Sequence, residues 1–281
     1  MSRLESIAKA GYFPTPPDVV QRIAGLIAPV RSGAQRTVRL IDPCCGTGMA
    51  LRQLAEAIGG ETYGIEIARD RYEESRGLLE HTLHASGLTA RVTASAFSCL
   101  LLNAPYDYDE ESKRLEHGFL VETSRLLCPG GVIAFIVPQR RLAVSARYLA
   151  GHYHDLACYR FPDPDFDAFH QVVVFGVKRQ TAVNDAASRG QVLAWSDAES
   201  LPVLPNPSKV APVYSLPTLR AGPIAFSSLF LDPREAALEA RHYGLWSNRA
   251  LMERLRPPEE KPVRPLMPLR RGHLAVLVTA G

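Results

Sequence analysis

The tetrapeptide Asn103-Ala104-Pro105-Tyr106 carries the groups needed to act on a planar amine. It follows an apolar run at residues 98–102, so Asn103 stands at the tip of a predicted buried strand. The side-chain oxygen of Asn103 accepts a hydrogen bond, and the carbonyl of Ala104, which precedes a proline, offers a second acceptor. Two such acceptors draw the lone pair of an NH2 group out of conjugation and direct it toward an electrophilic methyl group. Tyr106 offers a flat face for a nucleobase turned out of its stack. The alternative is a surface turn that carries this string by chance.

A second group of residues predicts a nucleoside site. Asp42-Pro43-Cys44-Cys45-Gly46-Thr47-Gly48 stands where a strand turns into a helix, and its glycines allow the backbone to pass close to a ligand. The loop lacks the Gly-x-x-x-x-Gly-Lys-Ser/Thr pattern of phosphate loops, and Leu51 replaces the third glycine of a dinucleotide fingerprint. Glu66 ends the next predicted strand, where a carboxylate can accept hydrogen bonds from both hydroxyls of a ribose. We therefore expect a nucleoside that carries something other than phosphates. A purely structural loop is the alternative.

The elements that must position these residues alternate along the chain. Strands are predicted at residues 37–41, 62–67, 90–94, 98–102 and 132–137, and helices at 15–27, 51–58, 69–86 and 115–127. Thr15 is the expected N-cap of the first helix. Residues 156–161 and 171–178 are predicted to pair antiparallel. The pattern predicts an α/β fold with a doubly wound, mostly parallel seven-stranded sheet and helices on both faces.

In this order, the motifs resemble those of class I S-adenosylmethionine-dependent methyltransferases, which have a Rossmann-like fold. The resemblance covers residues 10–178. It implies S-adenosylmethionine as cofactor. The Phe13-Pro14-Thr15-Pro16 turn is similar to an N-terminal motif of amino-methylating DNA enzymes that closes over the methionine end of the cofactor. The residues that the resemblance assigns to the cofactor are Phe13, Thr15, Asp42, Pro43, Cys44, Gly46, Gly48, Glu66, Ile67 and Asn103.

The tetrapeptide resembles the Asn/Asp-Pro-Pro-aromatic motif of DNA adenine-N6, DNA cytosine-N4 and some glutamine methyltransferases. On that resemblance Asn103, Ala104, Pro105 and Tyr106 form the catalytic motif, with Ala104 in place of a proline. The predicted third strand lacks the acid that usually meets the adenine of the cofactor. Ser95 and Phe97 are the expected substitutes.

Basic and aromatic residues follow the later strands and are expected to hold the substrate. Arg140 and Arg141 suit phosphate contacts, although a solvated helix start explains them equally well. Phe166 and Phe169 stand in a loop that resembles the segment where an aromatic residue of adenine methyltransferases packs on the target base, and simple hydrophobic packing is the alternative. With Tyr106, these residues predict DNA as partner. The acidic residues at 107–111 are expected to form a solvated loop or a gate.

The composition sets the outer limits of these predictions. The net charge of +3 neither requires nor excludes nucleic acid, and no apolar run reaches the about 20 residues that span a bilayer. Five scattered cysteines without a Cys-x-x-Cys pair favour a cytoplasmic protein that holds no metal. Twelve of the 22 prolines fall between Pro202 and Pro268. We therefore expect a methyltransferase domain over residues 1–180 and a proline-rich, mildly basic region over 181–281 that reads the substrate.

Three functions are open at this stage. The leading prediction is methyl transfer to N6 of an adenine flipped out of DNA. Methylation of RNA or of a protein glutamine uses the same tetrapeptide. A non-catalytic relative that binds nucleic acid is the third possibility, supported by Ala104 and by the missing acid. The sequence does not indicate the oligomeric state.

Overall fold

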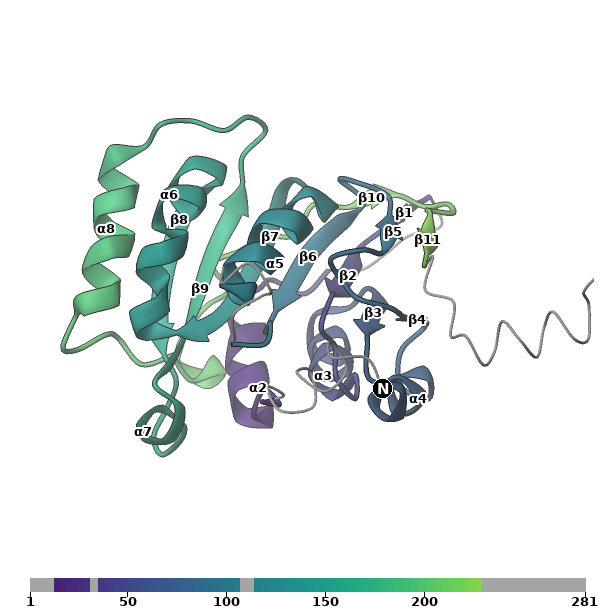
Figure 1. Cartoon of the computed structure of the whole chain (residues 1–281), viewed down its shortest axis with the longest axis horizontal. Coiled ribbons are helices and arrows are strands. Elements are labelled where there is room, and N and C mark those ends of the chain that lie inside the picture. The colour runs from purple at the N-terminus through teal and green to yellow at the C-terminus, as the bar shows by residue number, and fades with distance from the viewer. Residues whose placement is uncertain (1–12, 31–34, 107–113, 229–281) are drawn as a thin grey trace, which may run out of the picture. The chain divides into compact units, whose positions relative to one another are not determined.

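The computed structural model describes residues 13–30, 35–106 and 114–228, and these ranges build a layered α/β unit (Figure 1). Its centre is a seven-stranded sheet with the order β4-β3-β2-β6-β7-β9-β8. The strands are β2 (Arg39–Asp42), β3 (Glu61–Glu66), β4 (His81–His84), β6 (Phe97–Leu102), β7 (Leu127–Pro138), β8 (Tyr153–Arg160) and β9 (Gln171–Lys178). The first five in spatial order, from β4 to β7, are parallel, and β9 runs antiparallel to both β7 and β8. This is the predicted fold class, with the predicted antiparallel hairpin at one edge.

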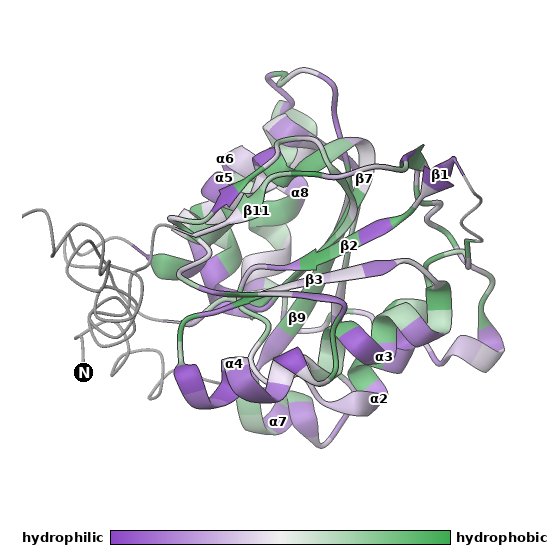
Figure 2. Cartoon of the chain, turned by 90° about the vertical axis from the view of Figure 1, so that its right-hand side faces the viewer, coloured by the Kyte–Doolittle hydropathy of each residue, from purple (hydrophilic) through white to green (hydrophobic). Residues whose placement is uncertain are grey.

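The central strands β2, β6, β7 and β9 bury side chains on both faces, which explains their continuous apolar runs. Ile133, Phe135 and Val137 of β7 point into one core, while the residues between them point into the other, as a strand's period of two requires. Figure 2 shows this hydrophobic interior along β2, β7 and β9.

Helices cover both faces of the sheet. One face carries α5 (Leu115–Thr123), α6 (Leu142–His152) and α8 (Ala186–Asp197). The other carries α2 (Pro17–Gly25) and α3 (Met49–Ile58), whose apolar residues recur at helical spacing. None of the helices in the described ranges has the length and apolar character needed to cross a lipid bilayer.

The helix predicted at residues 69–86 is wrong in its second half. Helix α4 (Arg69–Arg76) ends at Gly77, and His81–His84 form the edge strand β4, parallel to β3. Helix α4 is largely hydrophilic (Figure 2) and has Ser75 as its buried residue, so apolar periodicity does not mark its end. The predicted strand at residues 90–94 shrinks to β5 (Arg91–Val92), which lies outside the main sheet and pairs with β11 (Phe226–Ser227).

The described residues between 181 and 228 belong to the same compact unit as the sheet. Helix α8 packs on α6, and β10 (Leu219–Arg220) pairs with β1 (Arg36–Thr37). Between them, Leu204, Tyr214 and Leu216 are buried in the core beneath α2 and α3. Side chains after residue 180 therefore complete the core of this unit, and the division into two functional regions at that residue stays a prediction. The remainder of the predicted proline-rich region, from residue 229 on, lies outside the described residues.

Candidate functional site

A pocket opens at the carboxyl ends of β2, β3, β4 and β6, the edge where ligands bind in doubly wound sheets. It encloses about 1030 Å³, counting the space open to solvent. Segments far apart in sequence meet there: the turn before α2, the glycine loop, the end of β3, the end of β4, the tetrapeptide after β6, and helix α5. Its lining residues include Phe13, Pro14, Thr15, Asp42, Pro43, Cys44, Thr47, Glu66, Ile67, Arg71, Ser86, Asn103, Ala104 and Pro105.

The glycine loop forms the floor of this pocket. The N–H of Cys45 donates to the carbonyl of Ile65 (3.0 Å), which ties the loop to β3. Gly48 precedes the first residue of α3 with φ +85°, a left-handed conformation that favours glycine. A side chain there would also meet Leu79 at 3.0 Å. Gly46 and Gly48 shape the loop without lining the pocket, whereas Thr47 between them faces it.

Glu66 accepts more hydrogen bonds than Asp42, the other acid of the pocket floor, and it is 5% exposed. One carboxylate oxygen accepts from the N–H of Gly46 (3.0 Å), and the other accepts from the N–H of Ala68 and from the guanidinium of Arg71 (both 2.7 Å). A carboxylate has about four acceptor positions, so one remains for a ligand hydroxyl beside these three donors. Arg71, from the first turn of α4, was not predicted as a site residue, and no motif in the sequence marks it.

Burial controls the ionisation of the other polar groups in the floor. It raises the pKa of Asp42 from 3.8 to about 7, an effect that the N–H of Cys44, which donates to Asp42 at 2.8 Å, partly opposes. Burial and the neighbouring carboxylates also raise the pKa of the Cys44 and Cys45 thiols well above their usual value. Both cysteines therefore stay protonated at neutral pH, which does not suit them to act as nucleophiles.

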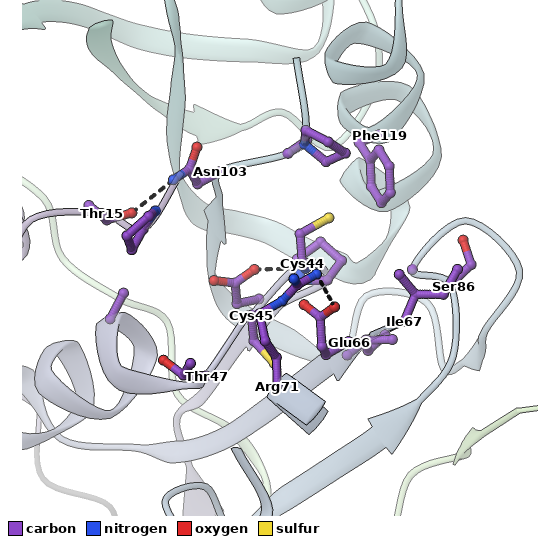
Figure 3. Close-up of a pocket in the computed structure, with 18 of the residues that line it drawn as sticks. Thr15, Cys44, Cys45, Thr47, Glu66, Ile67, Arg71, Ser86, Asn103 and Phe119 are labelled. Carbon is purple, nitrogen blue, oxygen red and sulfur yellow. Dashed lines mark hydrogen bonds and ion pairs between the residues drawn. The ribbon is translucent and has the colours of Figure 1, made fainter. Parts of the chain in front are cut away.

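The turn after β4 forms the far wall of the pocket and was missed in the sequence. Ser86 faces the pocket next to Ile67 (Figure 3). A Cβ added to Gly87 would lie 2.4 Å from the carbonyl oxygen of Pro43, so glycine permits this turn to touch the glycine loop. Ser95 and Phe97, predicted here, lie elsewhere: Ser95 is exposed and Phe97 is fully buried at the start of β6. They were assigned to the site because the third strand was placed at residues 90–94 rather than at β4.

Asn103 lies at the opposite side of the pocket from Ser86, and its amide is tied to the turn before α2 (Figure 3). Its Nδ2 donates to the carbonyl of Phe13 (2.9 Å) and to Oγ1 of Thr15 (3.0 Å). Thr15 is thus not the N-cap of the helix. Pro16 takes that position, with no side-chain cap. The neighbouring Ala104 is buried in the wall of the pocket.

The hydroxyl of Tyr106 completes the hydrogen bonding of Asn103. It donates to Oδ1 of Asn103 and accepts from Nε2 of Gln171 (2.9 Å). Burial, reinforced by the charge of Glu116, raises the pKa of Tyr106 far above its usual value. The hydroxyl therefore remains a donor at physiological pH.

Three aromatic rings gather beside Asn103. Phe13 stacks on Tyr106 with ring centroids 6.2 Å apart and meets Phe169 edge to face at 6.0 Å. A second hollow lies between the turn before α2 and the pair Phe169 and Gln171, and it shares Phe13, Pro14 and Thr15 with the main pocket. Phe13 and Phe169 are 44% and 45% exposed, so each has ring surface available to a ligand.

The remaining predicted substrate residues are not brought into the pocket. Phe166 packs against the cores of both faces, with the guanidinium of Arg160 5.0 Å above its ring. Arg140 and Arg141 are exposed in the short helix η2 (Gln139–Arg141), which follows β7 at the same edge of the sheet. The acidic residues 107–111 lie outside the described residues. Within the described ranges, no three His, Cys, Asp or Glu side chains gather to hold a metal ion.

The sheet order, the glycine loop and the buried acid after β3 define a Rossmann-like α/β protein with a nucleoside-sized pocket. Residues 1–218 match the uncharacterised methyltransferase family DUF6094, and the chain belongs to this family. It is therefore a methyltransferase by family.

Comparison with solved structures gives distant likenesses. A predicted O-methyltransferase from Agrobacterium tumefaciens is 19% identical, with a TM-score of 0.43 over 57% of this chain and 80% of that one. An S-adenosylmethionine-dependent methyltransferase from Aquifex aeolicus is 13% identical, with a TM-score of 0.41 over 63% of this chain and 100% of that one. No protein of curated function matches the chain.

Proposed function

We propose that this protein transfers a methyl group from S-adenosylmethionine to an exocyclic amine, namely N6 of an adenine turned out of DNA. The position of Asn103 carries the proposal. Its amide forms part of the pocket wall next to the aromatic rings of Phe13 and Tyr106, where a cofactor and a planar target can meet.

The residues of the main pocket fit the cofactor. Glu66 has an acceptor position left for a ribose hydroxyl, and Ser86 and Ile67 line the same end for an adenine. Asp42 supplies a carboxylate that can bind the cationic amino group of the methionine part of the cofactor. That part would lie at the side of the pocket lined by Phe13 and Thr15. When bound, S-adenosylmethionine supplies a sulfonium methyl group: the amine lone pair forms the N–C bond, the sulfur keeps the C–S electron pair, and the amine proton passes to water.

The chain's own groups would orient the amine. Oδ1 of Asn103 has one lone pair beyond the one that Tyr106 occupies, and a carbonyl oxygen with two lone pairs can accept a second hydrogen bond. The carbonyl of Ala104 is the expected second acceptor. Phe169 and Phe13 offer exposed ring surface, on which a base can stack with about 1–3 kcal/mol per base.

A specific observation favours a second candidate, the side-chain amide of a protein glutamine. Two aspartates, Asp165 and Asp167, stand in the same short helix as Phe169, α7 (Asp165–Phe169), and acidic side chains repel phosphate. A glutamine amide presents the same planar NH2 group without that charge. RNA remains the third possible target.

The test is incubation of the full chain with methyl-labelled S-adenosylmethionine and, in parallel, duplex DNA, RNA or cell protein. Digestion of the DNA to nucleosides, followed by mass analysis, should give N6-methyl-2′-deoxyadenosine as the labelled product. Label confined to protein or RNA would refute DNA as the target, and no label on any of the three would refute the activity.

The role of Asn103 is tested with Asn103→Ala. Removing one preorganised polar group at a reacting centre costs on the order of 100-fold in rate, so transfer should fall by that factor or more while cofactor still binds in calorimetry. Asn184→Ala, at an exposed position before α8, is the matched control and should retain full activity.

A further inference from the structure

We propose that Thr15 is a positioning residue, whose hydroxyl, with the carbonyl of Phe13, fixes the Asn103 amide so that its oxygen faces the target amine. This inference rests on the proposed function, because it concerns the amine to which Asn103 is directed. It differs from the prediction for Thr15, which was contact with the cofactor.

The amide nitrogen of Asn103 has two N–H groups, and the turn before α2 uses both. One donates to the carbonyl of Phe13 at 2.9 Å and the other to Oγ1 of Thr15 at 3.0 Å. A backbone carbonyl only accepts hydrogen bonds, so a rotated amide would place its oxygen against another oxygen. The carbonyl of Phe13 thus selects the orientation, and Thr15 adds the second anchor.

The oxygen of the Asn103 amide has its own hydrogen-bond donor, the hydroxyl of Tyr106. Gln171 donates to the hydroxyl oxygen of Tyr106 at 2.9 Å, and the hydroxyl proton of Tyr106 is directed at Oδ1 of Asn103, which lies closer than its other acceptor, the carbonyl of Ile136 at 3.5 Å. Donors and acceptors alternate from Gln171 through Tyr106 and Asn103 to Phe13. A rotated amide would break this order at the carbonyl of Phe13, which has no proton to donate, and would turn the proton of Tyr106 to the more distant carbonyl of Ile136.

The turn that supplies these anchors is stiff by composition. Pro14, Pro16 and Pro17 fix φ at three of four consecutive residues, and each proline disfavours the helical region for the residue before it. Helix α2 holds the turn in place, because Val19 and Ile23 are fully buried and the N–H of Val20 donates to the carbonyl of Pro16 at 3.1 Å. The turn is therefore ordered before any ligand arrives.

Thr15→Val tests the inference, because valine keeps the shape of threonine and removes the acceptor. Loss of one hydrogen bond corresponds to about a fivefold to tenfold change, which should appear in kcat. The Kd of S-adenosylmethionine and its KM should stay within about twofold, and Thr15→Ser should restore kcat. Thr181→Val, at an exposed position, is the matched control.

Asn103→Asp is the second variant. Aspartate keeps an acceptor for the amine but has no N–H groups, so a carboxylate oxygen would face the carbonyl of Phe13. Turnover should fall by at least about tenfold, even though the resembling family accepts aspartate at this position.

A third measurement does not depend on activity. The side-chain NH2 signal of Asn103, identified by its loss in Asn103→Ala, should move upfield in Thr15→Val and not in Thr181→Val. An unmoved signal overturns the inference, as does a weaker Kd for the cofactor with unchanged kcat, which would make Thr15 a cofactor ligand. A wild-type protein that methylates nothing would instead refute the proposed function, while the NMR signal would still report whether Thr15 holds Asn103.

Discussion

Replacing Asp42 by asparagine should stabilise the folded protein at neutral and alkaline pH. Asp42 is 3% exposed, and its burial raises the pKa from 3.8 to about 7. An unfolded chain has the ordinary value of about 3.9. Between these two values the folded protein keeps a proton that the unfolded chain has lost. The free energy of unfolding therefore falls as the pH rises through this window, by about 1.4 kcal/mol per pH unit.

The magnitude follows from the width of that window. Below about pH 4 the group contributes no penalty, and above about pH 7 the penalty is complete at about 4 kcal/mol. Asparagine resembles the protonated acid and keeps an oxygen for the N–H of Cys44. Asp42→Asn should thus be more stable than the wild type by about 1.5 kcal/mol at pH 5 and by about 4 kcal/mol at pH 8.

Urea unfolding at pH 5, 6, 7 and 8 measures this difference. Trp195 of α8 is partly buried and packs against the core, so its fluorescence reports unfolding of the described unit. The exposed Asp197→Asn is the control and should give the same small difference at every pH. An Asp42→Asn advantage that does not grow between pH 5 and pH 8, or a loss of stability at pH 8, would refute the reasoning.

Three further predictions concern the ligand sites and the extent of the unit. If the carboxylate form of Asp42 attracts the cationic cofactor, the Kd of S-adenosylmethionine should be about tenfold higher at pH 6 than at pH 8, and calorimetry should find no such change in Asp42→Asn. Phe169→Ala should raise the KM of the target about tenfold without loss of stability, whereas Phe166→Ala should lower the midpoint of urea unfolding, and a reversed pattern would contradict their assignments. A chain ending at residue 180 should lack a cooperative unfolding transition by circular dichroism, and a chain ending at residue 230 should keep it.

The sequence predicts the sheet where strands are buried on both faces and misses it where one is not. The central strands are rich in apolar residues because their side chains are buried in the cores on both faces of the sheet. Each of the predicted ranges 37–41, 62–67, 98–102 and 132–137 contains or overlaps an observed strand. Strand β4 is only four residues long, lies at the edge and reads His-Thr-Leu-His, so it carries no apolar run. Its position follows from pairing with β3, which is a tertiary contact. Because the third strand was predicted at residues 90–94, Ser95 and Phe97 were assigned to the cofactor although neither lines the pocket.

That the segment after α8 packs into the same unit as the sheet could not be predicted from the sequence, for a different reason. Its prolines and lack of periodicity suggest a separate extended region, and it is indeed extended over much of residues 198–228. Its few apolar side chains, such as Tyr214 and Leu216, nevertheless pack in the same core as helix α2, and the backbone N–H of Tyr214 donates to the carbonyl of Leu26 (2.9 Å). An extended chain that packs through single side chains has neither a helical nor a strand period. Only the folded arrangement shows that these residues belong to the domain.

In the candidate site, too, the features that are local in sequence could be predicted, and those that depend on distant residues could not. The glycine loop, Glu66 and the tetrapeptide are each local in sequence, so their strand-end positions can be predicted from the pattern, and the structure places them in one pocket. The residues that hold the motif are not local. Thr15, 88 positions from Asn103, accepts from its amide, and Gln171, 65 positions from Tyr106, donates to its hydroxyl. The four-residue motif therefore identifies Asn103 as the hydrogen-bond acceptor for the target amine. The orientation of its amide, and so whether its oxygen faces the substrate, depends on residues elsewhere in the domain. This division explains why an aspartate, allowed by the motif, should fail at position 103 of this chain.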